Sequence, residues 1–415
     1  MNAVSTPHVE PTRVDPMRVI IAGGGTGGHL YPGIALAEEI TARAGGEVLF
    51  VGTARGLESR LVPAAGFALE LLEVSGLKRK GARALARGLL RLPRAYLASR
   101  AILRRFRPDL VIGVGGYASG PIVLAAALSG YPTAIQEQNS RPGITNRVLG
   151  RFVRRVFIAF EESRGYFDGK KTALSGNPVR RRFLRERPGA GVADAEVAAA
   201  ARVSAPPTLL VVGGSQGARA VNDLVSDMVP ILAARARLPG MVVRTPLRIV
   251  HQTGPTDLER IRARYQASGM APAEVGAGVG VGVGVDLDVR AYIDDMPGEL
   301  GKATLVIGRA GALTLAELAI VGCPAILIPL PTAADDHQTL NARELQQAGA
   351  AVLVPQAGAT AQGLADLVTT LLADTARRAA MAAAMAALGR PDAARVIVDE
   401  LETLVSPPAA PGGAA

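Results

Sequence analysis

The stretch Val19-Ile20-Ile21-Ala22-Gly23-Gly24-Gly25-Thr26-Gly27-Gly28-His29 decides the fold of this chain. Its apolar first part predicts a buried strand, and residues 32–37 predict a helix. A glycine turn between a strand and a helix presents backbone N–H groups to an anion at the positive end of the helix dipole. Glycine suits the turn because a side chain would block close approach of the anion. The stretch therefore predicts an anion-binding turn at the start of an α/β domain.

The general motifs for such a turn fit this chain poorly. Gly23, Gly25 and Gly28 match the dinucleotide fingerprint G-x-G-x-x-G, which requires an acidic residue at the end of the second strand. The second predicted strand, residues 48–51, carries its acid, Glu47, at the start instead. The lysine of a nucleoside-triphosphate loop is also missing, because His29 occupies its place. The sequence argues against a nicotinamide enzyme, and we expect no cofactor.

The composition indicates two domains in a reducing compartment. The 415 residues exceed the usual size of one compact core. The single cysteine, Cys323, excludes an intramolecular disulfide and is expected to be a small buried hydrophobe. No apolar stretch reaches the ~18 residues of a membrane span. Residues 1–16 lack the features of a signal peptide, so we predict a disordered extension there and a disordered tail over residues 406–415. We expect a soluble, cytoplasmic protein whose net charge of +10 attracts anionic partners.

Strands and helices alternate along the chain, which is typical of parallel sheets. A boundary near residues 175–180 and a loose segment at 187–207 separate two halves, and residues 209–219 repeat the unit of strand, glycine turn and helix. We therefore predict two Rossmann-like domains with a cleft between them. Residues 276–285 alternate Gly and Val and predict a loop insertion, with an edge hairpin as the alternative. The predicted strands are 19–22, 48–51, 110–114, 134–136, 156–159, 209–212, 248–251, 305–307, 325–328 and 351–354.

A basic stretch interrupts the first half. Between Glu73 and Asp109 the chain has no acid, whereas a solvated helix face normally mixes both signs, so the stretch favours a surface that meets phosphates. Zinc ligands and stacking aromatics are missing, and we expect no nucleic-acid partner. An anionic membrane surface is the better interpretation, although Pro93 and Tyr96 replace the bulky aromatics expected at a bilayer. The cations are Lys78, Arg79, Lys80, Arg83, Arg87, Arg91, Arg94, Arg100, Arg104, Arg105 and Arg107.

Polar residues after predicted strands are candidate sites, each with a structural alternative. Asn139 faces the ligand crevice or caps a turn. Glu317 accepts ribose hydroxyls beside a glycine turn, or it forms a capping box with Thr314. Residues 335–341 form a polar cluster on a loop that enters a helix. The pair Asp286 and Asp288 has the spacing of a metal site, but we interpret it as surface charge and expect no metal.

The motifs together resemble the MurG family, the peripheral membrane N-acetylglucosaminyltransferases of peptidoglycan synthesis. The resemblance spans residues 17–400, and several of its motifs are long enough to make a chance match remote. The motifs are Gly24–His29, Gly115-Gly116-Tyr117, Glu137-Gln138-Asn139, Gly176-Asn177-Pro178-Val179-Arg180, Gly213-Gly214-Ser215-Gln216-Gly217-Ala218-Arg219, His251-Gln252-Thr253-Gly254, Gly311–Glu317 and Asp336-His337-Gln338.

The resemblance implies a GT-B glycosyltransferase fold with two Rossmann-like domains. Residues 17–178 would form the acceptor and membrane domain, residues 179–388 the domain that binds UDP-N-acetylglucosamine, and residues 389–405 a helix that packs back on the first domain. The acceptor would be lipid I, undecaprenyl-pyrophosphoryl-N-acetylmuramoyl-pentapeptide, with its diphosphate on the first glycine turn. The enzyme would act at the cytoplasmic face of the cell membrane, in cell-wall synthesis and thereby in cell shape and division, and a cell-wall synthesis complex is a possible partner.

The resemblance also implies roles for particular residues. Ser215 and Arg180 would meet the donor diphosphate, Ile293 would hold the uracil through its backbone, Glu317 would bind the ribose, and Gln338 the sugar hydroxyls. The phosphate turn would be lined by Ala312, Leu313, Thr314, Leu315 and Ala316. From the acceptor domain, Thr26, Gly27, Gly28 and Asn139 would approach across the cleft.

The implied reaction is an inverting displacement at the anomeric carbon by the C4 hydroxyl of the acceptor muramoyl sugar. It needs a base, and His29 is the best candidate because an imidazole takes up a proton near neutral pH. Hydrogen bonding by His29 to the acceptor or to its own loop is the alternative, and Glu137 competes for the role of base. Helix N-termini and Arg180 would stabilise the leaving UDP without a metal. A nucleotide-sugar epimerase and a non-catalytic membrane scaffold that binds nucleotide sugar are the other functions to separate.

Overall fold

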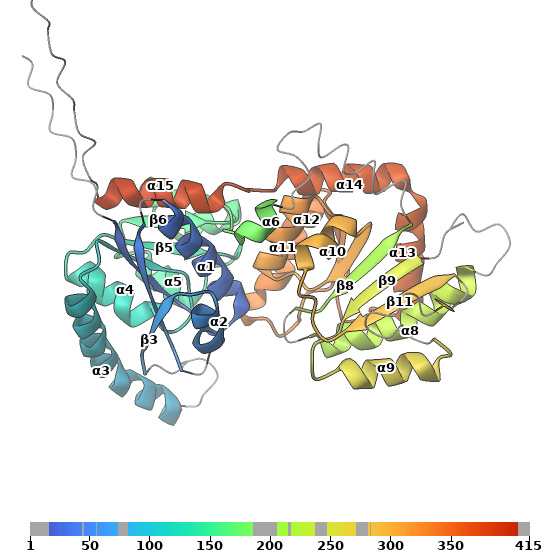
Figure 1. Cartoon of the computed structure of the whole chain (residues 1–415), viewed down its shortest axis with the longest axis horizontal. Helices are drawn as coiled ribbons and strands as arrows, with labels where there is room; N and C mark the ends of the chain where they lie inside the picture. Colours follow the sequence, from blue (N-terminus) through green and yellow to red (C-terminus); the bar gives the residue numbers. More distant parts are fainter. Residues whose placement is uncertain are drawn as a thin grey trace, which may run out of the picture.

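Two parallel sheets with helices on both faces lie side by side in the chain (Figure 1). The computed structural model describes residues 16–43, 45–54, 56–73, 82–185, 206–214, 217–236, 247–270, 281–282 and 284–405. The extensions predicted over residues 1–15 and 406–415 and the segment 187–205 lie outside the described residues. Within the described residues, no helix is both long and apolar enough to cross a membrane.

The first sheet contains seven parallel strands in the order β3-β2-β1-β4-β5-β6-β7. The strand β1 (Arg18–Ala22) is apolar after Arg18 because both of its faces are covered, as is usual in parallel sheets. The other strands are β2 (Glu47–Gly52), β3 (Ala68–Leu71), β4 (Leu110–Gly113), β5 (Thr133–Glu137), β6 (Arg155–Ile158) and β7 (Thr172–Leu174).

Helices of very different length cover this sheet. The glycine turn leads into α1 (Gly27–Ala42), which begins five residues before the predicted helix and takes Pro32 into its body. The remaining helical segments are α2 (Glu58–Ala64), α3 (Ala82–Phe106), α4 (Ser119–Leu128), α5 (Ile144–Leu149), η1 (Glu161–Tyr166) and η2 (Gly169–Lys171).

The second sheet repeats this plan in the order β10-β11-β9-β8-β12-β13-β14, with only the pair β10 and β11 antiparallel. Its strands are β8 (Thr208–Val212), β9 (Leu247–Gln252), β10 (Val281–Gly282), β11 (Val285–Arg290), β12 (Leu305–Gly308), β13 (Ala325–Leu327) and β14 (Ala351–Leu353). Its helices are α6 (Arg181–Arg185), α8 (Arg219–Ala236), α9 (Leu258–Ala267), α10 (Met296–Lys302), α11 (Ala312–Val321), η3 (Ala334–Asp336), α12 (His337–Gln347), α13 (Ala361–Ala373) and α14 (Thr375–Ala387).

The strand order places one ligand crevice in each domain. The order reverses between β1 and β4 in the first sheet and between β8 and β12 in the second. Ligands of open α/β sheets bind outside the carboxyl ends of the strands at such a reversal. Both glycine turns follow the first strand of their sheet and therefore lie at these points. The predicted fold class, two Rossmann-like domains, is confirmed.

Several local expectations differ from the structure. β3, β7 and β11 were not predicted, because β3 and β7 are short edge or near-edge strands and β11 follows the Gly-Val run directly. Residues 281–282 pair with β11 as a hairpin, so the described part of that run follows the alternative interpretation. Asp286 and Asp288 lie in β11, and Asp288 accepts hydrogen bonds from Arg290 and is paired with Arg248. Both are partly exposed residues of a strand and not of a loop.

The final helix, α15 (Ala393–Val405), packs against the first domain although it follows the second domain in sequence (Figure 1). Ile397, Val398 and Leu401 are fully buried in the core cluster that also contains residues of α1 and β1. Arg43 at the end of α1 donates a hydrogen bond of 2.7 Å to Asp399. The hydrophobic core of the first domain is therefore completed by the last helix of the chain.

Truncation of this helix's buried face should destabilise the first domain. Leu401→Ala leaves a cavity in the core, and we expect a loss of ~2–5 kcal/mol in the free energy of unfolding. Thr403→Ala, on the exposed face of the same helix, is the matched control and should change it by less than ~0.5 kcal/mol. Chemical denaturation measures both, and equal small effects would show that α15 does not belong to the core.

Candidate functional site

Two glycine turns of the first domain, residues 23–28 after β1 and residues 114–117 after β4, pack against each other at the carboxyl end of the sheet. Gly24 and Gly25 have φ values of 148° and 90°, which side chains other than glycine rarely adopt. Gly116 in the neighbouring turn has φ 86°, and a Cβ atom there would lie 2.5 Å from the carbonyl oxygen of Gly24. The backbones approach one another closely, and Thr26 is left exposed at the start of α1. Gly27, Gly28 and His29 form the half-buried first turn of that helix.

A buried carboxylate, Glu58 of α2, holds the first turn in place. Its Oε2 accepts from the N–H of Gly25 at 2.7 Å, and its Oε1 accepts from the N–H and hydroxyl of Thr53 at 2.7 and 2.8 Å. Burial raises the pKa of Glu58, but these hydrogen bonds outweigh it and lower the pKa below its usual range. The protein therefore supplies its own anion to the turn, so the Gly25 N–H is not free for the acceptor diphosphate. Sequence reasoning missed Glu58.

The side chain of Gln138 orients His29. The Gln138 amide nitrogen donates to the carbonyl of Val114 at 2.8 Å, which leaves its Oε1 to face the His29 ring. His29 Nδ1 lies 2.8 Å from that oxygen, so Nδ1 carries the proton and Nε2 is the nitrogen with a lone pair. Gly115 lies against the ring, where a Cβ atom would be 2.7 Å from Nδ1. The arrangement gives the ring one orientation and leaves Nε2 as its basic atom.

Glu137, the competing candidate for the base, is occupied by structural hydrogen bonds. Its Oε1 accepts from the N–H and side-chain amide of Asn139, and its Oε2 accepts from Gly143 and Asn146. The residue is 2 % exposed. Both carboxylate oxygens are engaged by donors of the protein and the side chain is buried, so it is not available to an acceptor hydroxyl, and the geometry favours His29.

Arg180 contacts residues of both domains, Tyr31 in the first and Glu317 in the second. Its guanidinium carbon lies 4.3 Å from the centre of the Tyr31 ring on α1, and its Nη2 donates to Glu317 Oε1 on α11 at 3.3 Å. The Nε of Arg180 is buried and has no hydrogen-bond partner in the described part of the chain. A buried guanidinium N–H without an acceptor suits an anionic ligand, since such a donor is costly to leave unpaired.

Glu317 lies inside α11 and does not cap it. The N-cap is Gly311, and the first intrahelical bond runs from the Leu315 N–H to the Gly311 carbonyl at 3.0 Å. Thr314 is already the third helical residue, so the capping-box interpretation is wrong. Burial raises the pKa of Glu317 to about 7, although Arg180 opposes the shift. Its carboxyl is therefore near the midpoint of its titration at neutral pH.

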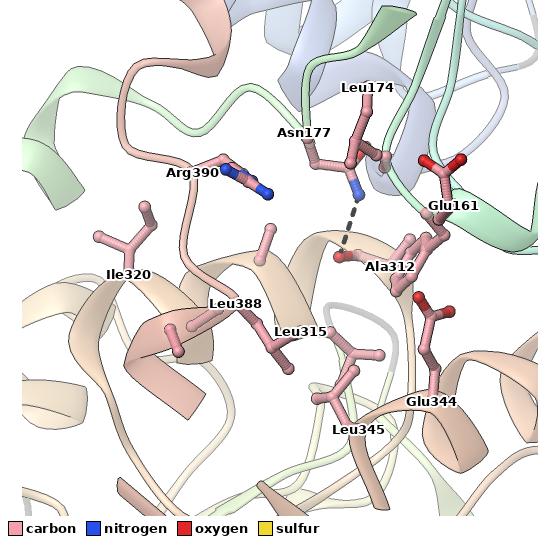
Figure 2. A pocket seen from close by; sticks show the side chains of 16 residues that line it. Glu161, Leu174, Asn177, Ala312, Leu315, Ile320, Glu344, Leu345, Leu388 and Arg390 are labelled. Atoms are coloured by element: carbon pink, nitrogen blue, oxygen red, sulfur yellow. Dashed lines mark hydrogen bonds between the residues drawn. The ribbon is translucent and has the colours of Figure 1, made fainter. Parts of the chain in front are cut away.

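The predicted phosphate turn, residues 312–316, forms the start of α11. The N–H groups of Ala312, Leu313 and Thr314 precede the first intrahelical bond and lie at the open, positive end of α11. Ala312, Leu315 and Ala316 also line a cavity on the flank of α11, and Figure 2 shows Ala312 and Leu315 at its wall.

Ile293 and Gln338, two more residues predicted to bind the sugar nucleotide, already form hydrogen bonds within the second domain. The Ile293 N–H donates to Gln252 at 2.9 Å, which leaves the Ile293 carbonyl for uracil. Gln338 accepts from the Leu330 N–H at 2.9 Å, which leaves its amide N–H groups for sugar hydroxyls. Ser215 lies outside the described residues.

Two asparagines join the halves of the site across the domain boundary. Asn341 of the predicted polar cluster accepts from the N–H and hydroxyl of Ser140 at 3.0 and 2.9 Å, and its amide donates to Asn139 at 3.3 Å. Asn177 donates to the carbonyls of Gln138 and Ala312 at 3.0 and 3.4 Å (Figure 2). Sequence reasoning placed these residues in motifs but did not assign them to the domain contact.

The described residues contain no group of three or more His, Cys, Asp and Glu side chains placed to hold a metal ion. One motif histidine, His251, is fully buried between Tyr265 and Asn222, at 2.9 and 3.2 Å. Burial lowers the pKa of His251 to about 3, so it stays neutral and acts as a structural hydrogen-bonding group.

Comparisons with known proteins agree with this geometry. Residues 19–158 match the glycosyltransferase family 28 N-terminal domain, and residues 208–397 match the glycosyltransferase family 28 C-terminal domain. A relative from Anaeromyxobacter sp. (strain Fw109-5) is 48% identical over 393 residues, 94% of either chain. A relative from Myxococcus xanthus is 46% identical over 384 residues, 92% of either chain. Both are named UDP-N-acetylglucosamine--N-acetylmuramyl-(pentapeptide) pyrophosphoryl-undecaprenol N-acetylglucosamine transferase.

Solved structures extend the comparison. The crystal structure of MurG from Acinetobacter baumannii superposes with a TM-score of 0.70 at 30% identity and covers 94% of this chain and 100% of its own. The UDP-GlcNAc 2-epimerase from Neisseria meningitidis, bound to UDP-GlcNAc, superposes with a TM-score of 0.61 at 14% identity and covers 93% of this chain and 100% of its own. The second likeness shows the fold alone.

Loss of the Glu58 charge should loosen the first glycine turn. Glu58→Gln should lower the free energy of unfolding at pH 7 by ~1.5–3 kcal/mol, the worth of hydrogen bonds to a charged group. The native pKa is depressed, so this contribution is complete above the unfolded pKa of ~4.3 and is lost as pH falls through the native pKa. Denaturant unfolding should therefore show wild type and variant converging in acid. A gap that persists there would contradict a role of the charge, and the exposed Glu259→Gln is the control.

Proposed function

Because the chain belongs to the MurG family, within glycosyltransferase family 28, we propose that it transfers N-acetylglucosamine from UDP-N-acetylglucosamine to lipid I. The acceptor group is the C4 hydroxyl of the N-acetylmuramoyl sugar, and the product is lipid II for peptidoglycan synthesis. This proposal rests on the relatives that are named for this activity. Seven of them are 44–48% identical to this chain over 93–94% of its length. The enzyme is a glycosyltransferase of the GT-B fold.

The site is built from both domains, which supports binding of the acceptor by one domain and of the sugar donor by the other. We assign the acceptor to residues 17–178, the donor to residues 179–388, and the return helix to residues 389–405. The donor diphosphate binds at the N-terminus of α11 beside Arg180, whose Nε has no hydrogen-bond partner among the described residues. The acceptor diphosphate binds at Thr26, Gly27 and Gly28, because Glu58 already occupies the Gly25 N–H.

The reaction is a single in-line displacement. The acceptor C4 oxygen forms a bond to the anomeric carbon while the bond from that carbon to the UDP oxygen breaks, which inverts the configuration. The hydroxyl proton moves to Nε2 of His29, whose tautomer is set by Gln138. The departing diphosphate gains negative charge, and Arg180 and the first turn of α11 stabilise it.

A transfer assay tests this function directly. Labelled UDP-N-acetylglucosamine and a short-chain lipid-linked muramoyl-pentapeptide acceptor should give a labelled disaccharide product, with UDP released only when acceptor is present. An epimerase would release UDP or convert the sugar without acceptor. A non-catalytic scaffold would bind the donor without any turnover. Either result would refute the proposal.

The titration of Glu317 should appear in nucleotide binding. Ribose hydroxyls donate hydrogen bonds, so they need the ionised carboxylate, and the pKa of Glu317 is raised to about 7. UDP affinity should therefore fall as pH drops below about 7, and calorimetry measures it. Glu317→Gln should weaken UDP binding by ~1.5–3 kcal/mol at pH 8 and remove the pH dependence. A variant that binds UDP normally would return Glu317 to a structural role with Arg180.

The coupling between His29 and Gln138 should appear in turnover. His29→Gln should lower kcat by ~10²–10⁴-fold, the usual worth of a general base. Gln138→Leu removes the acceptor that fixes the Nδ1 tautomer and should lower kcat by a smaller factor, with the donor KM nearly unchanged. In the double variant the loss should equal that of His29→Gln alone, because Gln138 acts through His29. Additive losses would contradict this positioning role.

We also place the membrane contact on α3 of the first domain. Arg94, Leu97 and Arg104 share the outer face of this helix, and all three are exposed, Leu97 to 63 %. Ile102 and Leu103 on the opposite face are buried. Leu128, at the end of the neighbouring α4, is 61 % exposed. Of the predicted basic stretch, residues 78–81 lie outside the described residues, as do the side chains of residues 82–92.

Charge reversal on this face should release the protein from anionic vesicles. Each Lys or Arg near such a surface contributes about 1 kcal/mol, so Arg94→Glu with Arg104→Glu should weaken binding at least ~10-fold. Arg343→Glu with Arg377→Glu, exposed in the second domain, is the matched control and should bind normally. Vesicle sedimentation measures binding, which should also fall with salt. Unchanged binding would exclude α3 as the docking face, and loss of activity on a water-soluble acceptor would place these arginines in the site.

A further inference from the structure

A second cavity lies on the flank of α11 away from the Arg180–Glu317 pair. It has a volume of about 230 Å³ and is lined from both domains. The first domain contributes residues 159–161, which follow β6, together with Leu174, Gly176 and Asn177. The second contributes α11, α12 and the end of α14 with the segment that leaves it. Figure 2 shows Asn177 and Ala312 joined by a hydrogen bond at its border. Both segments by which the chain passes between the domains therefore border this cavity.

Most of the cavity wall is apolar. The larger apolar side chains are Phe160, Leu174, Leu315, Ile320, Leu345 and Leu388. The charged residues of the lining are Glu161, Glu344 and Arg390. Glu161 and Glu344 lie together at one end, and Arg390 lies across the cavity from them (Figure 2). The stem of Arg390 is held against Gly176, where a Cβ atom would lie 2.6 Å from the Arg390 Cβ. The cavity thus has an apolar body and an acidic end.

The acidic end contains an unpaired carboxyl oxygen. Oε2 of Glu344 is buried and has no hydrogen-bond partner in the described part of the chain. The charged groups that face Glu344 are Glu162 and Glu161 of η1, from the other domain. Burial, then the hydrogen bond and charge of Glu162, then the charge of Glu161 raise the pKa of Glu344 to about 9. At neutral pH the carboxyl of Glu344 is therefore protonated.

We propose that this cavity binds a small organic cation with an apolar body, such as a primary alkylammonium ion. The ammonium group lies at the acidic end against Glu344 and Glu161, and the alkyl chain lies along the apolar side of α11. An ammonium group carries three donors and one positive charge, which meet the unpaired Oε2 and the charge of ionised Glu344, whereas Glu161 is already paired with Arg164. The apolar lining removes the alkyl chain from water. No part of this assignment depends on the transferase activity.

Binding of such a cation must be coupled to loss of a proton from Glu344. The protonated carboxyl has no charge to pair with the ammonium, so the complex contains the carboxylate. Below the native pKa of Glu344, the apparent affinity should therefore rise up to ~10-fold for each pH unit. This pH dependence distinguishes the proposed site from an apolar cavity that binds hydrophobic molecules without regard to charge.

Calorimetry with n-hexylammonium on the full chain tests the proposal. Titration at pH 7 in two buffers of different ionisation enthalpy should show saturable binding with release of close to one proton. The affinity should increase between pH 7 and pH 8.5. Hexanol, the neutral analogue of the same length, should bind at least tenfold more weakly and release no proton. Binding without proton release, equal binding of hexanol, or no saturable binding would each overturn the proposal.

Two variants and one control complete the test. Glu344→Gln keeps the size of the side chain and removes a crowded carboxyl, so the protein should fold, which a melting curve verifies. It should bind hexylammonium at least tenfold more weakly and release no proton. Ala387→Phe, at the mouth of the cavity, keeps every charge and should block binding sterically. The exposed Glu259→Gln on α9 should bind as the wild type does. Wild-type affinity in Glu344→Gln would exclude the acidic end as the binding group.

Discussion

The buried amide of Asn177 is the contact on which the arrangement of the site depends. Its nitrogen donates to the carbonyl of Gln138 in the first domain and to that of Ala312 at the start of α11. Its oxygen accepts from Gln136 at 2.9 Å, and Gln136 in turn contacts Gln138. Since Gln138 orients His29, one hydrogen-bonded chain connects the base with the helix end assigned to the donor phosphates. A buried network of this kind has few alternative arrangements, because each unpaired member would be costly.

Four carboxyls that lie partly or fully in the interior of the described structure show three different environments. Glu58 and Glu137 each accept hydrogen bonds at both carboxyl oxygens, so each shapes a loop. Glu317 is paired with Arg180, and burial holds its pKa near neutrality, where a ligand with hydroxyl groups shifts it easily. Glu344 faces other carboxyls across the domain boundary and is protonated. The number of donors around each group, and not its burial alone, decides which of them are structural and which can respond to a ligand.

The chain passes between the domains twice, and both passages use glycine where backbones come close. Gly176 has φ 81° and lies against Arg390. Gly389, on the second passage, lies where a Cβ atom would be 2.8 Å from the carbonyl of Ala319. The helix that follows, α15, then completes the first domain's core. The domains are thus connected by two short, tightly packed segments and by side-chain contacts at the site, which allows the cleft and the cavity behind α11 to share the wall formed by that helix.

The sequence by itself determined the elements with a local cause. Apolar runs such as Val19–Ala22 predict buried strands, glycines at positive φ mark the turns, and their repetition after residue 208 predicts a second domain of the same plan. The resemblance carried by the motifs supplied the activity, because long motifs are specific where single glycine turns are not. The roles of His29, Arg180 and the other site residues remain predictions from that resemblance.

Only the tertiary structure decided which distant side chains meet. Gln138 lies 109 positions from His29, Glu58 lies 33 from Gly25, and Glu317 lies 137 from Arg180. Nothing in the local pattern distinguishes these residues from turn, cap or surface positions, and the spacing of Thr314 and Glu317 even favoured a capping box. The reason is physical: the period of apolar residues reports which face of an element is buried. Which polar groups are brought together is set by the order of strands in the sheet and by the packing of one domain on the other.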